Sequence, residues 1–189
     1  HAESAWTELG ESEALPFDDL FERAAPLLLE KGGVVEGGPG VGKSTLTNLL
    51  KKKLDDVPHV VCAPTHAAAR VLSGITLHRF MRKVLGSNGQ TPKVNEQFVI
   101  VDEAWFCSQT LLVFLSALRQ ASPELRFLLV GDPEQFRCPC DSWQGAEIDE
   151  GALERSALLH QLAGGVRVKL TQPKRFDLTL FRWLSLPFE

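Results

Sequence analysis

One short string of residues constrains this chain more than any other. Residues 37–44 read Gly-Gly-Pro-Gly-Val-Gly-Lys-Ser, which matches the pattern G-x-x-x-x-G-K-[ST]. The apolar pair Val34-Val35 precedes the string, and leucines at helical spacing follow it over residues 45–54. Glycines let backbone N–H groups converge on phosphate oxygens, and the positive end of the following helix points at the same anion. The string therefore predicts a phosphate loop that binds a nucleoside triphosphate.

Two side chains of this loop are expected to act on the nucleotide directly. Lys43 supplies a cation for the β- and γ-phosphates, and Ser44 supplies a hydroxyl ligand for Mg²⁺. The alternative is a chance glycine-rich turn, but such a turn does not explain why strand, loop, Lys-Ser pair and helix stand in register. The residues expected to surround the phosphates are Gly38, Pro39, Gly40, Val41, Gly42, Lys43, Ser44 and Thr45.

The composition is that of a globular protein. The chain has 189 residues, enough for one α/β domain, and 44% of them are hydrophobic. It contains no run of about 18 apolar residues that would indicate a membrane span, and it does not start with a secretory signal pattern. The four cysteines form no secreted-type disulfide pattern, so we expect an intracellular location. The chain begins with His1 rather than Met, which indicates a fragment.

Charge is segregated along the chain, although the net charge is only −4. Residues 1–42 hold nine acidic and two basic side chains, whereas residues 43–93 hold nine basic and two acidic ones. A basic middle is compatible with a polyanion path on one face of the protein. The alternative is a solvated helix face, which is our interpretation of Lys51-Lys52-Lys53 taken alone.

Apolar segments alternate with segments of helical periodicity, which indicates the α/β class. Because the strand segments are almost entirely apolar, they predict a parallel sheet with helices on both faces and ligands at the carboxyl ends of the strands. Strands are expected at residues 34–36, 59–63, 97–102, 126–130 and 166–170, and helices at 17–31, 43–54, 67–72, 109–120 and 178–184.

The same alternation predicts the domain boundaries. Residues 1–16 are polar and acidic, so we expect a poorly ordered N-terminus. Residues 17–184 should form one nucleotide-binding domain, and residues 185–189 should be a truncated end.

Two of the predicted strands end in polar residues. Val-Ile-Val leads into Asp102 and Glu103, where Asp102 would help to hold Mg²⁺ and Glu103 would polarise the attacking water. The alternative is an ordinary acidic strand end. A second apolar strand ends in Gly131-Asp132, and Gln135 follows one turn later. A neutral amide at Gln135 could sense the γ-phosphate without adding charge, although Gly-Asp-Pro alone is only a turn signal.

Together these strings resemble the first RecA-like motor domain of superfamily-1 helicases, in the branch of RecD-like and viral DNA helicases. Residues 63–69, 74–80 and 170–177 resemble three further motifs of that family, and the resemblance covers residues 32–184. It implies ATP and Mg²⁺ as cofactors, and it implies that Arg175 reaches the γ-phosphate.

The resemblance also implies a path for a single nucleic-acid strand. The implied contacts are Pro64, Thr65, His66, Thr76, His78 and Phe80. The threonine hydroxyls would contact phosphates, and the flat rings of His78 and Phe80 would stack on bases. Alternatives remain open: Phe80 as a core aromatic, His78 as a structural histidine, and Thr65 as a helix N-cap.

The chain departs from the family in two respects. Related helicases often carry a glutamine ahead of the phosphate loop that reads adenine, but the first glutamine here is Gln90. The second RecA-like motor domain is absent, so the fragment is expected to be weakly active or inactive.

We therefore expect a monomeric motor domain that prefers single-stranded DNA to RNA. The alternatives are an RNA helicase of the positive-strand RNA virus type and a nucleotide-gated nucleic-acid-binding module that does not unwind.

Overall fold

A parallel sheet of seven strands forms the centre of the computed structural model. The structure describes residues 5–10, 15–85, 94–135, 142–143, 146–147 and 157–172. The strands of the sheet lie in the order β1-β9-β2-β6-β5-β3-β4, and every neighbouring pair is parallel. They are β1 (Thr7–Leu9), β2 (Gly33–Glu36), β3 (His59–Ala63), β4 (Ile75–Thr76), β5 (Phe98–Val101), β6 (Arg126–Gly131) and β9 (Val166–Lys169).

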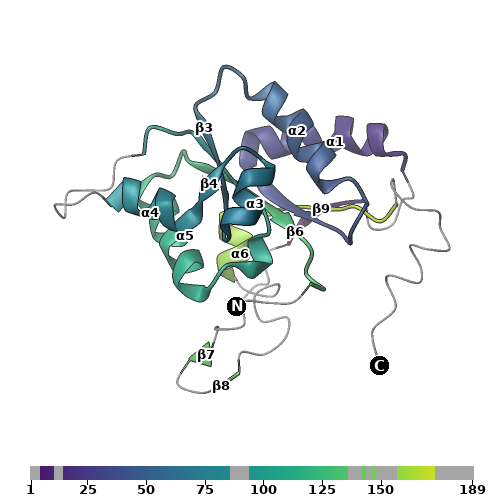
Figure 1. The fold of residues 1–189 in the computed structure, drawn as a ribbon. Helices are drawn as coiled ribbons and strands as arrows, with labels where there is room; N and C mark the ends of the chain where they lie inside the picture. The colour runs from purple at the N-terminus through teal and green to yellow at the C-terminus, as the bar shows by residue number, and fades with distance from the viewer. Residues whose placement is uncertain are drawn as a thin grey trace.

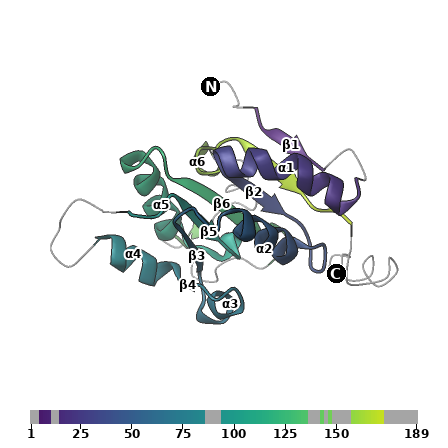
Figure 2. The same cartoon turned by 90° about the horizontal axis from the view of Figure 1, so that it is seen from above.

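Helices cover both faces of the sheet (Figures 1 and 2). The helices are α1 (Phe17–Lys31), α2 (Lys43–Lys53), α3 (His66–Val71), α4 (Leu77–Leu85), α5 (Gln109–Ala121) and α6 (Ala157–Leu162), with a 3₁₀ turn η1 (Ala104–Phe106). A separate antiparallel pair consists of β7 (Ser142–Trp143) and β8 (Ala146–Glu147). No helix in the described part of the chain is long and apolar enough to cross a bilayer.

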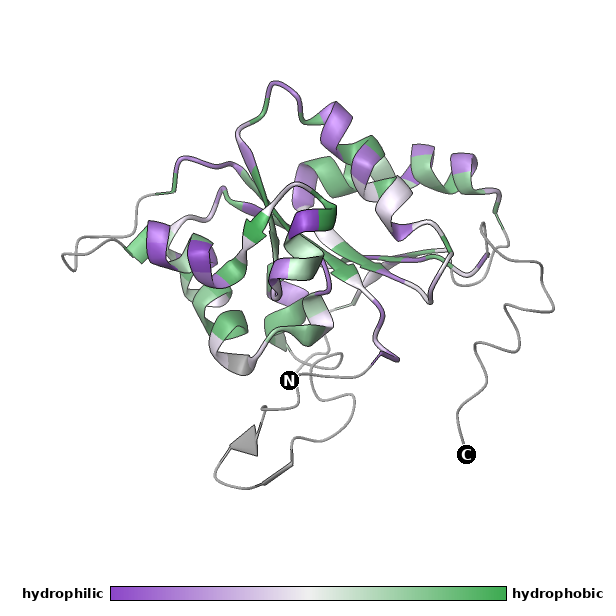
Figure 3. Cartoon of the chain, in the orientation of Figure 1, coloured by the Kyte–Doolittle hydropathy of each residue, from purple (hydrophilic) through white to green (hydrophobic). Residues whose placement is uncertain are grey.

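Alternation along the strands divides the core into two layers. In β2, Val35 packs with α1 and α2 on one face, whereas Val34 packs with α4, α5 and α6 on the other. Ile100 and Val99 of β5 divide in the same way. Because both faces are covered, the inner strands β2, β5 and β6 are largely apolar and buried, and Figure 3 shows green strands at the centre. The predicted α/β architecture with a parallel sheet is confirmed.

Residues 5–10 differ from the expectation of a poorly ordered N-terminus, because they contain the strand β1. β1 pairs with β9 at the edge of the sheet, and this pair is parallel like the others. The ring of Trp6 meets that of His160 edge-on at 4.7 Å between centroids, and the Arg167 guanidinium lies 4.1 Å from the Trp6 ring centre. A ring contact and a cation–π contact thus hold an acidic segment whose composition predicts disorder. Residues 5–10 are part of the domain.

Arg167 also connects this edge strand to the phosphate loop. Its Nε lies 3.3 Å from Glu36 Oε1, and its guanidinium reaches Glu8 Oε1 at 3.7 Å. Glu36 is buried and is the last residue of β2, directly ahead of the loop. One arginine therefore links β1, β9 and β2 on the same face of the sheet.

The expected helix at residues 178–184 lies outside the described residues. So does the expected end at residues 185–189.

Trp6→Ala is expected to release β1 from the sheet. Losing the ring and cation–π contacts should lower the free energy of unfolding by about 1–2 kcal/mol. Hydrogen exchange should become faster at the amides of residues 7–9, and Trp6→Phe should restore part of the protection. Unchanged exchange in Trp6→Ala would show that strand pairing alone holds β1.

Candidate functional site

The phosphate loop turns from β2 into α2 with backbone angles that favour glycine. Gly42 has φ +104° and Gly40 has φ +79°, so both lie in the left-handed region. A side chain at Gly38 would meet no atom within 4 Å, so the backbone there faces open space. Helix α2 begins at Lys43, directly after Gly42. The loop therefore presents an accessible backbone at the N-terminus of an eleven-residue helix.

Lys43 bends back over this loop. Its ammonium group donates hydrogen bonds to the carbonyl of Gly37 and, at 2.9 Å, to the carbonyl of Gly38. Partial burial lowers the pKa of Lys43, and the negative charges of Asp132, Glu103 and Asp102 act in the opposite direction. The negative charges of three carboxylates that follow two other strands therefore act on one cation.

Asp102 and Glu103 follow β5 at its carboxyl end. The backbone N–H of Asp102 donates to the Cys62 carbonyl at 2.8 Å, which holds this end against β3. Burial is the main cause that raises the pKa of each acid, and the neighbouring charge of Asp102 raises that of Glu103 further. Glu103 has φ +53°, an uncommon conformation for a residue with a side chain. The turn thus aims two adjacent acids at the loop at the cost of backbone strain.

Asp132 is the acid that the sequence analysis did not select as a site residue. It follows β6, is 5% exposed, and is the strongest of the three charges acting on Lys43. Its Oδ1 accepts a hydrogen bond from the N–H of Glu134 at 3.0 Å, and its carbonyl accepts one from the N–H of Gln135 at 3.3 Å. Its importance rests on the direct pairing of β6 with β2, which the structure shows and the sequence does not state.

Gln135 is half-buried in the turn that Asp132 organises. Trp105 packs this turn against the turn that carries Glu103. A Cβ added at Gly131 would lie 2.6 Å from Trp105 Cε3, so only glycine fits beneath the indole ring. Trp105 is buried, and its contact with Gly131 joins the two acidic strand ends.

Other predicted phosphate-loop residues occupy consistent positions. Ser44 and Thr45 are exposed in the first turn of α2, whereas Val41 is buried below the loop. The residues fit a magnesium–nucleotide ligand: an open backbone, a cation, an exposed hydroxyl and carboxylates converge at one place. No group of three or more His, Cys, Asp or Glu side chains suited to a metal ion occurs among the described residues. Arg175 lies outside the described residues.

The two predicted threonines cap helices next to the site. Thr65 Oγ1 accepts a hydrogen bond from Ala68 N at 3.2 Å at the start of α3. Thr76 Oγ1 accepts one from Arg79 N at 3.3 Å at the start of α4, and Thr76 itself is largely buried. The N-cap interpretation of Thr65 is confirmed.

The ring positions differ from the stacking hypothesis in one case. Phe80 is fully buried and meets Phe114 edge-on at 6.4 Å between centroids. The expectation that Phe80 stacks on a base is therefore wrong for this structure. Phe80 lies on the face of α4 that packs into the core, together with Leu77 and Val84. His66 and His78 are exposed, and Pro64 is half-buried.

All these groups lie along one edge of the sheet. The loop follows β2, Asp132 follows β6, Asp102 follows β5 and Thr65 follows β3, and these strands are consecutive neighbours in the sheet. Because the strands are parallel, their carboxyl ends meet at the same edge. Among the described residues, the structure thus brings the phosphate loop together with Asp102, Glu103 and Gln135. The segments that carry Thr65 and Thr76 begin at the same edge.

Residues 23–177 match the sequence model of the AAA domain family. No curated protein matches the chain in sequence. Among solved structures, the fold is similar to Pif1 helicase from Candida albicans, with a TM-score of 0.64 and 20% identity over 86% of this chain and 41% of that chain.

Two Bacteroides structures are similar to the same degree. Bacteroides Pif1 bound to ssDNA has a TM-score of 0.64 and 21% identity, over 90% of this chain and 45% of that chain. Pif1 from Bacteroides sp. in complex with ADP-AlF4 has a TM-score of 0.60 and 19% identity, over 87% and 44%. At such identities the likeness concerns the fold, which is the predicted RecA-like P-loop fold. The chain spans less than half the length of these structures, and the RecD-like branch stays a prediction.

The raised pKa values predict how stability depends on pH at this site. Since folding raises the pKa of Glu103, its contribution to stability is present below its usual pKa of 4.5 and is lost as pH rises through the folded value. Glu103→Gln removes this loss. The variant should therefore gain stability relative to the original chain as pH rises from about 4 to 7, measured by denaturant unfolding.

Glu124→Gln is the matched control, because Glu124 is exposed and remote from the loop. If Glu103→Gln were less stable at pH 7 and the difference did not change with pH, Glu103 would be held by favourable contacts rather than by burial.

Proposed function

The chain belongs to the AAA domain family, and we propose that it is the ATP-binding motor domain of a superfamily-1 DNA helicase or translocase. The observation that carries this proposal is the position of Lys43 in a phosphate loop, with Asp102, Glu103 and Asp132 converging on it from two neighbouring strands. A structural ion-pair cluster would need neither the accessible loop backbone nor the exposed Ser44.

In this proposal each residue around the loop has one task. Lys43 exchanges its two carbonyl partners for phosphate oxygens, and its cationic form neutralises charge that develops in the reaction. Ser44 and Asp102 hold Mg²⁺, which when bound supplies positive charge to the β- and γ-phosphates. Glu103 accepts the proton of the attacking water, and its raised pKa favours that role. Gln135 reports the state of the γ-phosphate.

Arg175 is assigned to the γ-phosphate by its position in the matching motif. It follows β9, the neighbour of β2 on the side away from β6. An arginine at the γ-phosphate would add a second positive charge to that of Lys43.

Single-stranded DNA is the proposed partner. Pro64, Thr65 and His66 follow β3, and Thr76 and His78 follow β4 at the same edge of the sheet. The Bacteroides Pif1 structures of the same fold were solved with ssDNA and with ADP-AlF4, which supports a nucleotide and a strand as joint ligands here. We place the protein inside the cell, where such a strand occurs.

Full motor activity is proposed to need a second RecA-like domain. The similar structures are more than twice as long as the part that this chain matches. Since helicases of this kind hold ATP between two domains, the chain alone should bind nucleotide as a monomer but hydrolyse it slowly or not at all.

Lys43→Ala is expected to abolish high-affinity ATP binding. The change removes a charged donor and leaves Asp102, Glu103 and Asp132 to repel the triphosphate, so affinity should fall by at least about 10- to 150-fold. Calorimetric titration with ATP–Mg²⁺ measures this, with Lys52→Ala on the exposed face of α2 as the control. Equal affinity in Lys43→Ala would disprove the phosphate-loop assignment.

His78→Ala is expected to weaken binding to single strands without loss of stability, because His78 is exposed at the start of α4. If the ring stacks on a base, the loss should be about 1–3 kcal/mol. Fluorescence anisotropy of a labelled dT oligonucleotide, with matched RNA and with and without ATP–Mg²⁺, measures it. Gln120→Ala on the outer face of α5 is the control.

The same titration separates the candidate functions. Tighter binding to DNA that responds to ATP and weakens with salt supports the DNA motor. A preference for RNA supports the alternative of a viral-type RNA helicase. Nucleotide-dependent binding with no unwinding by a chain that includes the second domain supports a gated binding module.

A further inference from the structure

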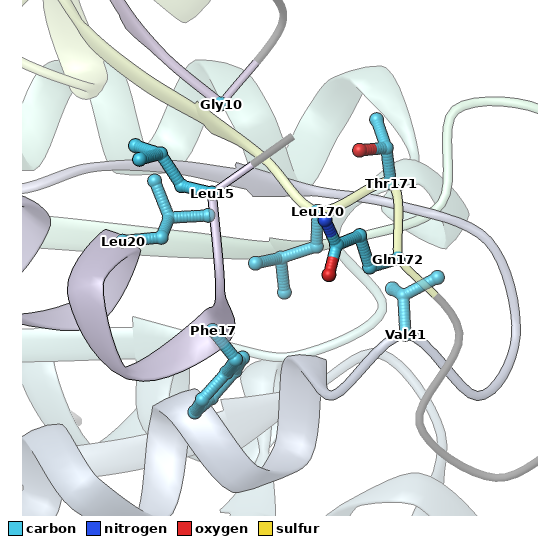
Figure 4. A pocket seen from close by; sticks show the side chains of 8 residues that line it. All are labelled: Gly10, Leu15, Phe17, Leu20, Val41, Leu170, Thr171 and Gln172. Atoms are coloured by element: carbon cyan, nitrogen blue, oxygen red, sulfur yellow. The ribbon is translucent and has the colours of Figure 1, made fainter. Parts of the chain in front are cut away.

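A half-open pocket lies directly beside the phosphate loop (Figure 4). Val41 of the loop lines one side, and Leu170, just after β9, lines the pocket next to it. Leu15, Phe17 and Leu20, at the start of α1, line the opposite side. Because Val41 belongs to both, the pocket and the loop are direct neighbours.

The residues that line the pocket are tightly packed against the phosphate loop. Leu170 N donates a hydrogen bond to the Glu36 carbonyl at 2.8 Å. A Cβ added at Gly37 would lie 2.7 Å from the Val41 side chain and 2.5 Å from the Leu170 carbonyl. These contacts fix the position of the lining residues relative to the phosphate loop.

The chemistry of the pocket suits the face of a base, although its enclosed part has room for little more than a water molecule. Its lining is mainly apolar, and such a surface accepts the face of an aromatic ring. The enclosed part is narrow, so the ring would lie across the leucines and Phe17 with its polar edge turned outward. The edge would then meet whatever polar side chain stands at the rim.

Gln172 stands at that rim. Among the described lining residues, only Thr171 and Gln172 have polar side chains. In Figure 4 the amide of Gln172 turns towards Leu170 and the pocket, whereas Thr171 points away. Gln172 is exposed, and no hydrogen bond to its amide occurs within the described part of the chain. Its donor and acceptor are therefore available to a ligand.

We infer that Gln172 sets the base preference of this site and selects adenine over guanine. The inference rests on the proposed function, since it concerns the same nucleotide. An amide matches adenine, because its oxygen accepts from N6–H while its NH₂ donates to N7. Guanine presents two acceptors, O6 and N7, so the amide oxygen would face an acceptor. Gln172 supplies this amide from the segment after β9, the strand next to β2.

Competition binding tests this assignment on the whole chain. A ribose-labelled fluorescent ATP is displaced by ATP, by GTP and by inorganic tripolyphosphate, which carries no base. The original chain should prefer ATP to GTP by about five- to tenfold, the lower part of the range for one amide–adenine pair because the rim is exposed. Gln172→Ala should abolish that preference and leave the affinity for tripolyphosphate unchanged.

A change of preference provides the sharper measurement. Arginine donates to both O6 and N7 of guanine, so Gln172→Arg should favour GTP over ATP. Gln120→Ala removes an exposed glutamine from α5, far from the loop, and should leave the ratio as it is. Thermal melts of all variants should coincide, because Gln172 makes no described contact that the fold needs.

Two failures are distinguishable. If ATP and GTP bind equally to the original chain, or if a preference survives Gln172→Ala, the assignment of Gln172 is overturned while Lys43-dependent binding keeps the proposed function. If neither nucleotide nor tripolyphosphate binds the original chain, the proposed function fails and this inference fails with it.

Discussion

One cation held among three acids organises this molecule. Lys43 lies partly buried between the loop carbonyls and the carboxylates of Asp102, Glu103 and Asp132. Burial disfavours the charged forms of Lys43, Asp102 and Glu103, and the charges of opposite sign act against that effect. They offset one another only if β5, β6 and β2 end at the same level. The electrostatics of the site and the register of the sheet are thus a single constraint.

The sheet meets that constraint because its strands are parallel and continuously apolar. Their carboxyl ends form one edge, and buried side chains on both faces prevent a slip in register. Trp105 adds a rigid contact at that edge, since it packs onto Gly131 where no other residue fits. A movement of the turn that carries Glu103 would therefore displace the turn that carries Gln135.

The sequence was informative where local chemistry dictates structure. The phosphate loop and the strand at residues 59–63 could be predicted, because glycine geometry and apolar runs are local signals. β1 could not, because its stability comes from the distant residues His160 and Arg167. The motif position of Phe80 left both stacking on a base and packing in the core open. A motif fixes position along the chain, whereas the periodicity of α4 decides which side chains enter the core.

Asp132 shows a different limit, because its importance depends on strand order. Nothing in the chain states that β6 rather than β5 pairs with β2. The threonines at the same edge show how one group can serve both fold and function. A hydroxyl has two acceptor lone pairs and one donor proton. Thr65 and Thr76 use acceptor capacity to cap α3 and α4. Thr65 is exposed, and its O–H donates no hydrogen bond to the described part of the chain. Capping therefore fixes the position of this hydroxyl without using the proton that a phosphate would accept.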